Sequence, residues 1–131
     1  MLRVSTRLSD DLEDLIHRVI GCCIDVHRAL GPGLLESIYS RAVWIELGAQ
    51  GIAFEREKLL PVTYRDQLIC NQRIDIVVEK QLVLEIKSVE RIHPVHRAQV
   101  LTYLRVSKLP VALLMNFNVA VLREGLDRIV L

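Results

Sequence analysis

Aromatic residues and net charge are both scarce in this sequence of 131 residues. Phe, Trp and Tyr make up 5% of the chain, so a buried core has to be built mainly from Leu, Ile and Val. Acidic and basic residues nearly cancel, which leaves a formal net charge of +1 at pH 7. Tight, salt-driven binding of nucleic acid is therefore not expected from the overall charge, although a local basic rim remains open.

Cysteine is also rare, and the three cysteines present form no paired motif. Cys22 and Cys23 are adjacent on an expected helix, where neighbouring side chains project in different directions and do not bridge each other. No CxxC spacing indicates a zinc site. The opening MLRVSTRLSDDLED lacks a long apolar segment and turns acidic early. We therefore expect no secretory leader and a reducing, cytoplasmic location.

Long hydrophobic runs are absent too. Those near LPVALLMNFNVAVL are too short to span a bilayer and contain two asparagines, so we expect no membrane partner. The hydrophobic fraction is nevertheless 51%, which argues against disorder and fits a single domain over residues 1–131. So many apolar residues in so small a chain leave some of them outside the core, and we expect a homodimer.

What remains is an ordered alternation of helices and strands. The GPG turn at residues 31–33 separates two helical segments, the second over about 34–48. Three strand-like segments lie within residues 53–87, followed by a helix that Pro94 opens and by the wholly apolar strand VALLMNF. A turn and a short strand end the chain. This order predicts an α/β fold with a mixed β-sheet flanked by helices.

The apolar hairpin over residues 73–87 carries charges where buried side chains are expected. If its turn is centred on Lys80, then Asp75 lies opposite Glu85. Lys87 is two residues beyond Glu85 and projects from the same face. Opposed like charges repel, so the two carboxylates need a proton or a cation. The alternate residues are expected to face the core on the other side: Ile74, Ile76, Leu84 and Ile86.

Oxygen ligands such as these two carboxylates favour a hard cation, Mg²⁺ or Mn²⁺, over zinc. A carboxylate pair that holds such a metal beside a lysine is an arrangement that cleaves phosphodiesters. The metal polarises the phosphoryl oxygen, and the lysine orients water or offsets developing charge. A second interpretation stays open, in which the carboxylates form a salt-bridge cluster with Lys87 and Arg73 and need no metal.

Several motifs together carry a resemblance to a known family. D-x(9)-E-x-K at Asp75, Glu85 and Lys87 resembles the signature of the PD-(D/E)XK nuclease superfamily. GPGLLESIY has the G-x-x-E-x-x-Y spacing and resembles the GxxExxY protein family, a branch of that superfamily. HRALGPGLLES, LEIKSVE, the H-x-x-Q-x-x-x-Y helix and LLMNFN extend the resemblance from about Ile16 to the end of the chain. Ile74 stands where the superfamily's name has proline, at a position that is loose in the superfamily.

The resemblance implies a fold and a set of roles. The fold is a restriction-endonuclease-like core in the order αβββαβ, with an extra N-terminal helix. Asp75 and Glu85 would hold Mg²⁺ or Mn²⁺ with the main-chain carbonyl of Ile86. Lys87 would be the catalytic lysine, and Glu36 would bring a further carboxylate to the metal. The substrate-binding or supporting residues would be Gln99 and Tyr103, which match the Q-x-x-x-Y element of RecB-like nucleases, together with His96 and Tyr39.

Plainer interpretations exist for some of these residues. Glu36 could complement the positive end of its helix, and Tyr39 could be a packing residue with a tethered hydroxyl. Gln99 and Tyr103 could form an ordinary amphipathic boundary. His96 could be a structural histidine.

The function that the resemblance implies is hydrolysis of nucleic acid by a metal-dependent nuclease, with DNA as the expected partner. The alternative is a non-catalytic nuclease-fold module that binds nucleic acid or a protein, or that works only within a complex. The intact carboxylate–lysine set favours the enzyme, whereas the near-neutral net charge favours the module.

Overall fold

A computed structural model describes residues 8–131 and gives the expected alternation of elements. The residues before position 8, which include part of the opening segment judged to lack a leader, lie outside this range. The elements follow one another as α1 (Asp10–Leu30), α2 (Glu36–Ala49), β1 (Phe54–Tyr64), β2 (Gln67–Val78), β3 (Leu82–Lys87), α3 (Pro94–Ser107), β4 (Val111–Asn116), the short 3-10 helix η1 (Leu122–Gly125) and β5 (Leu126–Val130).

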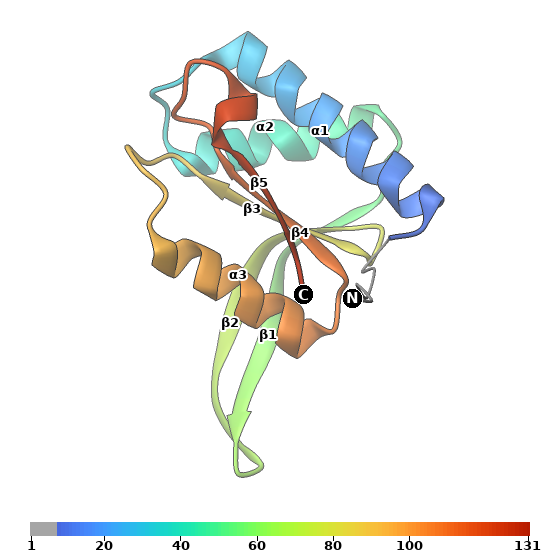
Figure 1. Ribbon diagram of the computed structural model, residues 1–131, viewed down its shortest axis with the longest axis vertical. Coiled ribbons are helices and arrows are strands. Elements are labelled where there is room, and N and C mark those ends of the chain that lie inside the picture. The colour runs from blue at the N-terminus through green and yellow to red at the C-terminus, as the bar shows by residue number, and fades with distance from the viewer. Residues whose placement is uncertain (1–7) are drawn as a thin grey trace, which may run out of the picture.

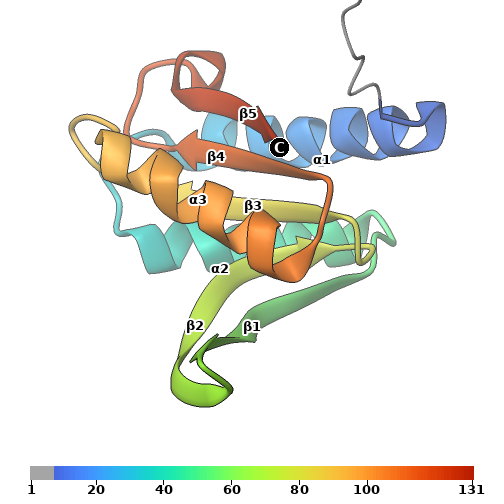
Figure 2. The same cartoon turned by 60° about the horizontal axis from the view of Figure 1, so that its bottom comes forward.

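The strands form one mixed sheet in the order β1-β2-β3-β4-β5 (Figure 1). Strands β3 and β4 are parallel and are joined by α3, whereas the other neighbouring pairs are antiparallel. The predicted α/β architecture is confirmed. Because α1 and α2 pack in one cluster with the sheet and α3 packs in another, the sheet lies between two helical layers (Figure 2).

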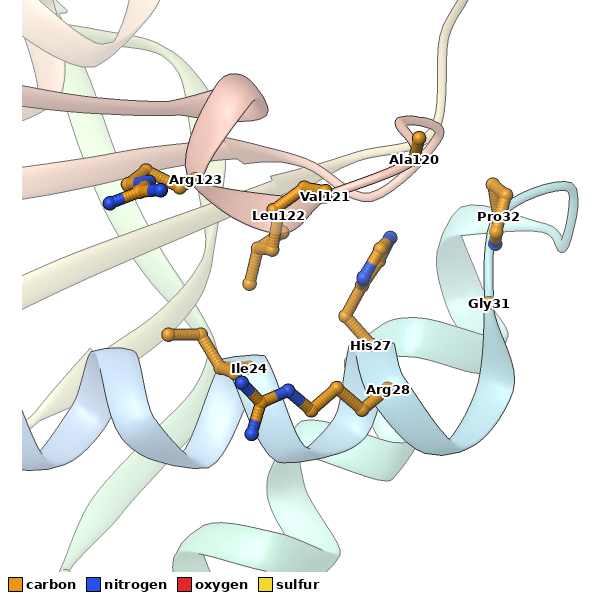
Figure 3. Close-up of a pocket in the computed structure, with 9 residues that line it drawn as sticks. All are labelled: Ile24, His27, Arg28, Gly31, Pro32, Ala120, Val121, Leu122 and Arg123. Carbon is orange, nitrogen blue, oxygen red and sulfur yellow. The ribbon is translucent and has the colours of Figure 1, made fainter.

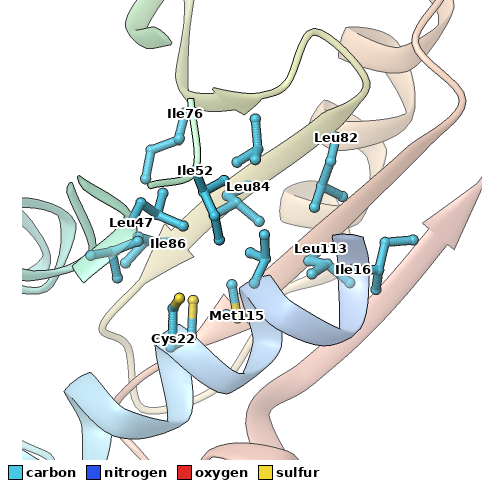
Figure 4. Close-up of a cluster of buried hydrophobic side chains, with 14 of the residues drawn as sticks. Ile16, Cys22, Leu47, Ile52, Ile76, Leu82, Leu84, Ile86, Leu113 and Met115 are labelled. Carbon is cyan, nitrogen blue, oxygen red and sulfur yellow. The ribbon is translucent and has the colours of Figure 1, made fainter. Parts of the chain in front are cut away.

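The core follows from the alternation of side chains along β3. Leu82, Leu84 and Ile86 point toward α1 and α2 and are fully buried, as the close-up of this cluster shows (Figure 4). Val83 points the other way and packs in the cluster of α3. Since Glu85 lies two residues beyond Val83, this alternation turns the acidic residue toward the layer of α3.

Ile74 departs from the expected alternation. It was predicted to share a face with Ile76, but Ile74 packs in the α3 cluster and Ile76 in the opposite one. The change occurs beside Glu57, a residue of β1 with a φ of 53°, and at Asp75. The prediction was wrong because strict two-residue alternation requires regular extended backbone, and the paired strands are irregular at this step.

Two turns require the glycines that they contain. Gly31 and Gly33 have φ values of 70° and 98°, which let the GPG segment end α1 and redirect the chain into α2. Gly125 in η1 lies so close to β4 that a Cβ there would overlap the carbonyl oxygen of Asn116. The turn at Gly125 therefore brings loop backbone against the carboxyl end of β4.

The β1–β2 hairpin extends well beyond the helical layers (Figure 1). Leu59, Tyr64, Leu68 and Ile69 are each more than half exposed on it. This is apolar surface that a second copy could cover, and the homodimer expected from composition stays a prediction. Among residues 8–131, no helix has the length and apolar character needed to cross a membrane.

Candidate functional site

The two hairpin carboxylates meet where the β2–β3 ladder ends. Val78 pairs with Leu82 and Ile76 with Leu84, which is the register expected from a turn centred on Lys80. One step further, Asp75 and Glu85 exchange side-chain bonds with the opposite backbone. The Asp75 amide donates to Glu85 Oε1 at 3.2 Å, and the Ile86 amide donates to Asp75 Oδ2 at 3.0 Å.

Glu85 is a buried acid with an unfavourable charge. Its side chain is 4% exposed, and burial together with the neighbouring charge of Asp75 raises the pKa of Glu85 to about 8. The Asp75 amide and the charge of Lys87 act in the opposite direction but do not cancel the effect. At neutral pH the site therefore favours a proton or a cation on this pair.

Lys87 ends β3 beside the pair and is half-buried. Its carbonyl accepts a hydrogen bond from the Phe117 amide at 2.8 Å, which fixes the backbone. Within residues 8–131 the ammonium makes no ion pair shorter than 4 Å. Arg73 pairs with Glu57 at 3.8 Å instead of with Asp75 or Glu85. The closed salt-bridge cluster of the second interpretation is therefore not formed.

Glu36 begins α2 and is half-buried near the same charges. Burial raises its pKa, Lys87 lowers it and Asp75 raises it further. The Ser88 amide also favours the ionised form. Glu36 thus lies at a helix N-terminus and within electrostatic reach of the lysine and one carboxylate, so its two proposed roles are compatible.

Helix α3 contributes unequally to the site. Tyr103 is 8% exposed, and burial followed by the charges of Glu85 and Asp75 raises the pKa of its hydroxyl. His96 accepts a hydrogen bond from the His93 amide as part of the cap of α3. Burial, Lys87 and His93 lower its pKa. Gln99, by contrast, is exposed, and no hydrogen bond joins its side chain to another described residue.

Tyr39 lies inside the fold and not at the carboxylates. Its hydroxyl donates to the Gly31 carbonyl and accepts from the Leu34 amide, and its ring stacks on Phe117 with centroids 4.8 Å apart. Tyr39 therefore ties the GPG turn to the core directly before Glu36. The residue holds the backbone that leads into the site.

The tie predicts a stability effect for Tyr39→Phe. The change keeps the ring but leaves the Leu34 amide and the Gly31 carbonyl without their partner, which is expected to cost about 1–3 kcal/mol of unfolding free energy. Urea unfolding measures it. Tyr64→Phe is the matched control, since Tyr64 is exposed on the hairpin. Equal stability of the two variants would contradict the assigned role.

Two residues that sequence reasoning did not single out fix the segment after Lys87. Asn116 is buried; its Oδ1 accepts from the Val89 amide at 3.1 Å and its Nδ2 donates to the Val89 carbonyl at 2.8 Å. Ser88 Oγ donates to the Leu34 carbonyl at 2.6 Å. Asn116 pairs with Lys87 across the parallel strands. The signal in the sequence is the asparagine that ends an otherwise apolar strand, at the edge where parallel strands end together.

The site residues fit a hard cation in chemistry, although they are not gathered as a metal centre. Asp75, Glu85 and the Ile86 peptide supply only oxygen ligands, and the pair carries buried negative charge that a cation would relieve. Among the described residues there is no group of three or more His, Cys, Asp or Glu side chains that could hold a metal ion. The charge of Asp75 raises the pKa of Glu36, but Glu36 does not complete such a group.

A separate cavity of about 590 Å³ lies between the end of α1 and the segment around η1 (Figure 3). His27 and Arg28 line it from α1, and Leu122 and Arg123 line it from the facing segment. His27 Nε2 bonds to the Val119 carbonyl at 2.8 Å, so this histidine fastens the two segments together. No carboxylate of the described part of the chain lines this cavity, so it is separate from the carboxylate site described above.

Comparison with known proteins bears on the same set of residues. Residues 13–129 match the family described as the PD-(D/E)XK nuclease superfamily. Searches of curated proteins and of solved structures gave no match. The match runs from the first turn of α1 into β5, and it includes α2, α3, strands β1 to β4 and the hairpin that carries Asp75, Glu85 and Lys87. With that fold and that hairpin in one continuous match, the chain belongs to the PD-(D/E)XK nuclease superfamily.

Proposed function

We propose that this chain hydrolyses phosphodiester bonds of nucleic acid with the help of a divalent cation, and that DNA is its substrate. The observation that carries the proposal is a lysine that makes no ion pair within residues 8–131 and lies beside a carboxylate pair of which Glu85 is buried. A structural cluster would pair Lys87 with the acids, whereas a catalytic site leaves the ammonium available to substrate. Membership of a nuclease superfamily supports the same conclusion.

Asp75, Glu85 and the Ile86 carbonyl would hold Mg²⁺ or Mn²⁺, with Glu36 as a further carboxylate. When bound, such a cation polarises the phosphoryl group and neutralises its charge. The rest of the chemistry falls to the chain. Lys87 would offset charge that develops on the phosphate oxygens. Ser88 and Asn116 hold the backbone directly after Lys87, the residue whose side chain would act on the phosphate.

We also propose that the chain belongs to the GxxExxY branch. Each residue of that spacing has a task at the entrance to α2, which supports the assignment. Gly33 has a φ of 98° in the turn, Glu36 interacts with Lys87 and Asp75, and Tyr39 secures the turn from below. The spacing of three residues between Glu36 and Tyr39 places one side chain toward the site and the other in the core.

The test of the nuclease is a cleavage assay on labelled single-stranded DNA, duplex DNA with ends, and RNA. The wild-type protein is expected to cut DNA with Mg²⁺ or Mn²⁺ and to be silent in chelator. Glu85→Gln should remove cutting, because it removes the negative charge that would attract the cation. Glu90→Gln is the control, since Glu90 is exposed in the loop after β3.

Two results would overturn this function. One is the absence of metal-dependent cutting on every substrate. The other is equal cutting by wild type and Glu85→Gln, which would indicate a contaminating nuclease. Either result would put a non-catalytic module that binds nucleic acid or a protein ahead of the enzyme.

A further inference from the structure

A cleft of about 360 Å³ opens beside the carboxylate site, between α2 and the β1–β2 hairpin. Glu36 and Asp75 are among its lining residues, so the cleft is continuous with the candidate site. Its volume lies within the range of small-ligand pockets. The remaining lining residues are Ser37, Ser40, Arg41 and Trp44 from α2, and Glu57 and Arg73 from the two strands.

Helix α2 forms one wall because its buried residues leave a polar face free. Tyr39, Val43 and Leu47 are fully buried and point into the core. Ser37 and Arg41 are four residues apart and therefore share the adjacent face of the helix. That face has no packing task in the described part of the chain, yet it carries side chains that donate hydrogen bonds.

The lining of the cleft carries charges of both signs. Arg41 and Arg73 are its basic residues, and Glu36, Glu57 and Asp75 are its acidic residues. Arg41 has no ion pair within residues 8–131, and Arg73 has only Glu57 at 3.8 Å, with both of those side chains more than half exposed. Such an exposed pair is weak and can be exchanged for another anion.

We propose that this cleft binds the sugar–phosphate backbone of a nucleic acid strand next to the phosphate that is cut, with Arg41 and Arg73 as the phosphate ligands. Guanidinium groups bind phosphate oxygens in a bidentate manner, and the Ser37 and Ser40 hydroxyls can donate to a further oxygen. The proposal rests on the proposed function for the phosphate at the carboxylates, and it adds the path that the strand takes from there. It also assigns local phosphate ligands to a chain whose net charge is only +1.

Trp44 is a fluorescent reporter for ligand binding in this cleft. It is the one tryptophan in the sequence, it lines the cleft, and the Arg56 guanidinium lies over its ring at 4.8 Å. Its buried indole N–H has no hydrogen-bond partner among the described residues. An unpaired buried donor of this kind is a group whose surroundings change when a ligand or ordered water supplies an acceptor.

The experiment measures binding without cutting. Short labelled single-stranded DNA and RNA are titrated with the protein in calcium and in chelator, and anisotropy is recorded beside Trp44 fluorescence. Wild type is expected to bind with a change in Trp44 emission. Arg41→Ala and Arg73→Ala should each raise Kd several-fold and lower the slope of log affinity against log salt by about 0.7, the value for one phosphate of a single strand. Glu57→Gln should lower Kd, because it frees Arg73.

Arg105→Ala is the control, an exposed arginine near the far end of α3, and should bind as wild type does. The proposal is overturned if wild type does not bind, if Trp44 emission does not respond, or if the cleft variants bind as Arg105→Ala does. Its failure is separable from that of the nuclease. Arginine-dependent binding without any cutting removes the nuclease and keeps the cleft, whereas cutting with arginine-independent binding does the reverse.

Discussion

Alanine at Lys87 is expected to lower the rate of phosphodiester cleavage by about 10²–10³-fold, the usual effect of removing one preorganised electrostatic group. The ammonium has no ion pair shorter than 4 Å within residues 8–131, so its charge remains available to a bound phosphate. It also favours the ionised forms of Glu85 and Glu36. Replacing Lys87 with alanine should therefore raise the pKa of both acids. It also removes the positive charge that would interact with the substrate phosphate.

Single-turnover cleavage of labelled DNA measures the loss. Lys87→Met keeps most of the half-buried aliphatic stem and should be as inactive as Lys87→Ala, because the missing feature in both is the charge. Lys58→Ala is the matched control, since Lys58 is partly exposed and, within residues 8–131, forms an ion pair only with Glu55. Full activity of Lys87→Met would show that the side chain contributes packing alone.

Much of the site could be predicted from the hairpin sequence. Apolar alternation and a short polar turn define a register, and in an antiparallel pair the register defines which residues are neighbours. That is why Asp75 and Glu85 were expected together, and the Asp75 amide does donate a hydrogen bond to the Glu85 carboxylate. The same local logic placed the end of α1 at the GPG turn.

What could not be predicted depends on contacts between distant segments or on irregular backbone. Ile74 packs on the face opposite to the one expected, at the step where the neighbouring strand β1 is irregular at Glu57. The sequence around Ile74 contains no signal of that irregularity. Asn116 reaches back to Val89, which lies in the loop after another strand. Gln99 satisfies the spacing of a motif, but the turn of α3 leaves it exposed while Tyr103 is buried beside the acids. Spacing of four residues places two side chains on the same face of a helix, but it does not determine how deeply each is buried.

The second large effect expected is on stability, where Glu85→Gln should stabilise the metal-free protein at pH 8. The pKa of Glu85 is about 8 in the folded chain, against an ordinary value of 4.5. Between these values the folded state binds more protons than the unfolded state, so wild-type stability falls as pH rises through this range. A tenfold change in proton affinity corresponds to about 1.4 kcal/mol. The variant should thus gain on the order of a few kcal/mol relative to wild type by pH 8, and little near pH 4.5.

Urea unfolding of both proteins in chelator from pH 4.5 to 9 measures this difference. Glu90→Gln should follow wild type at every pH, because its side chain is exposed. Manganese should reduce the difference in unfolding free energy between wild type and Glu85→Gln at pH 8. A cation bound to the folded wild type would neutralise the charge of ionised Glu85. The variant itself should respond less to the metal, because it has lost one of the two charges. A gap between wild type and Glu85→Gln that stayed the same from pH 4.5 to 9 would mean that Glu85 does not carry the buried charge, and with it the electrostatic reason for a cation at this hairpin would be lost.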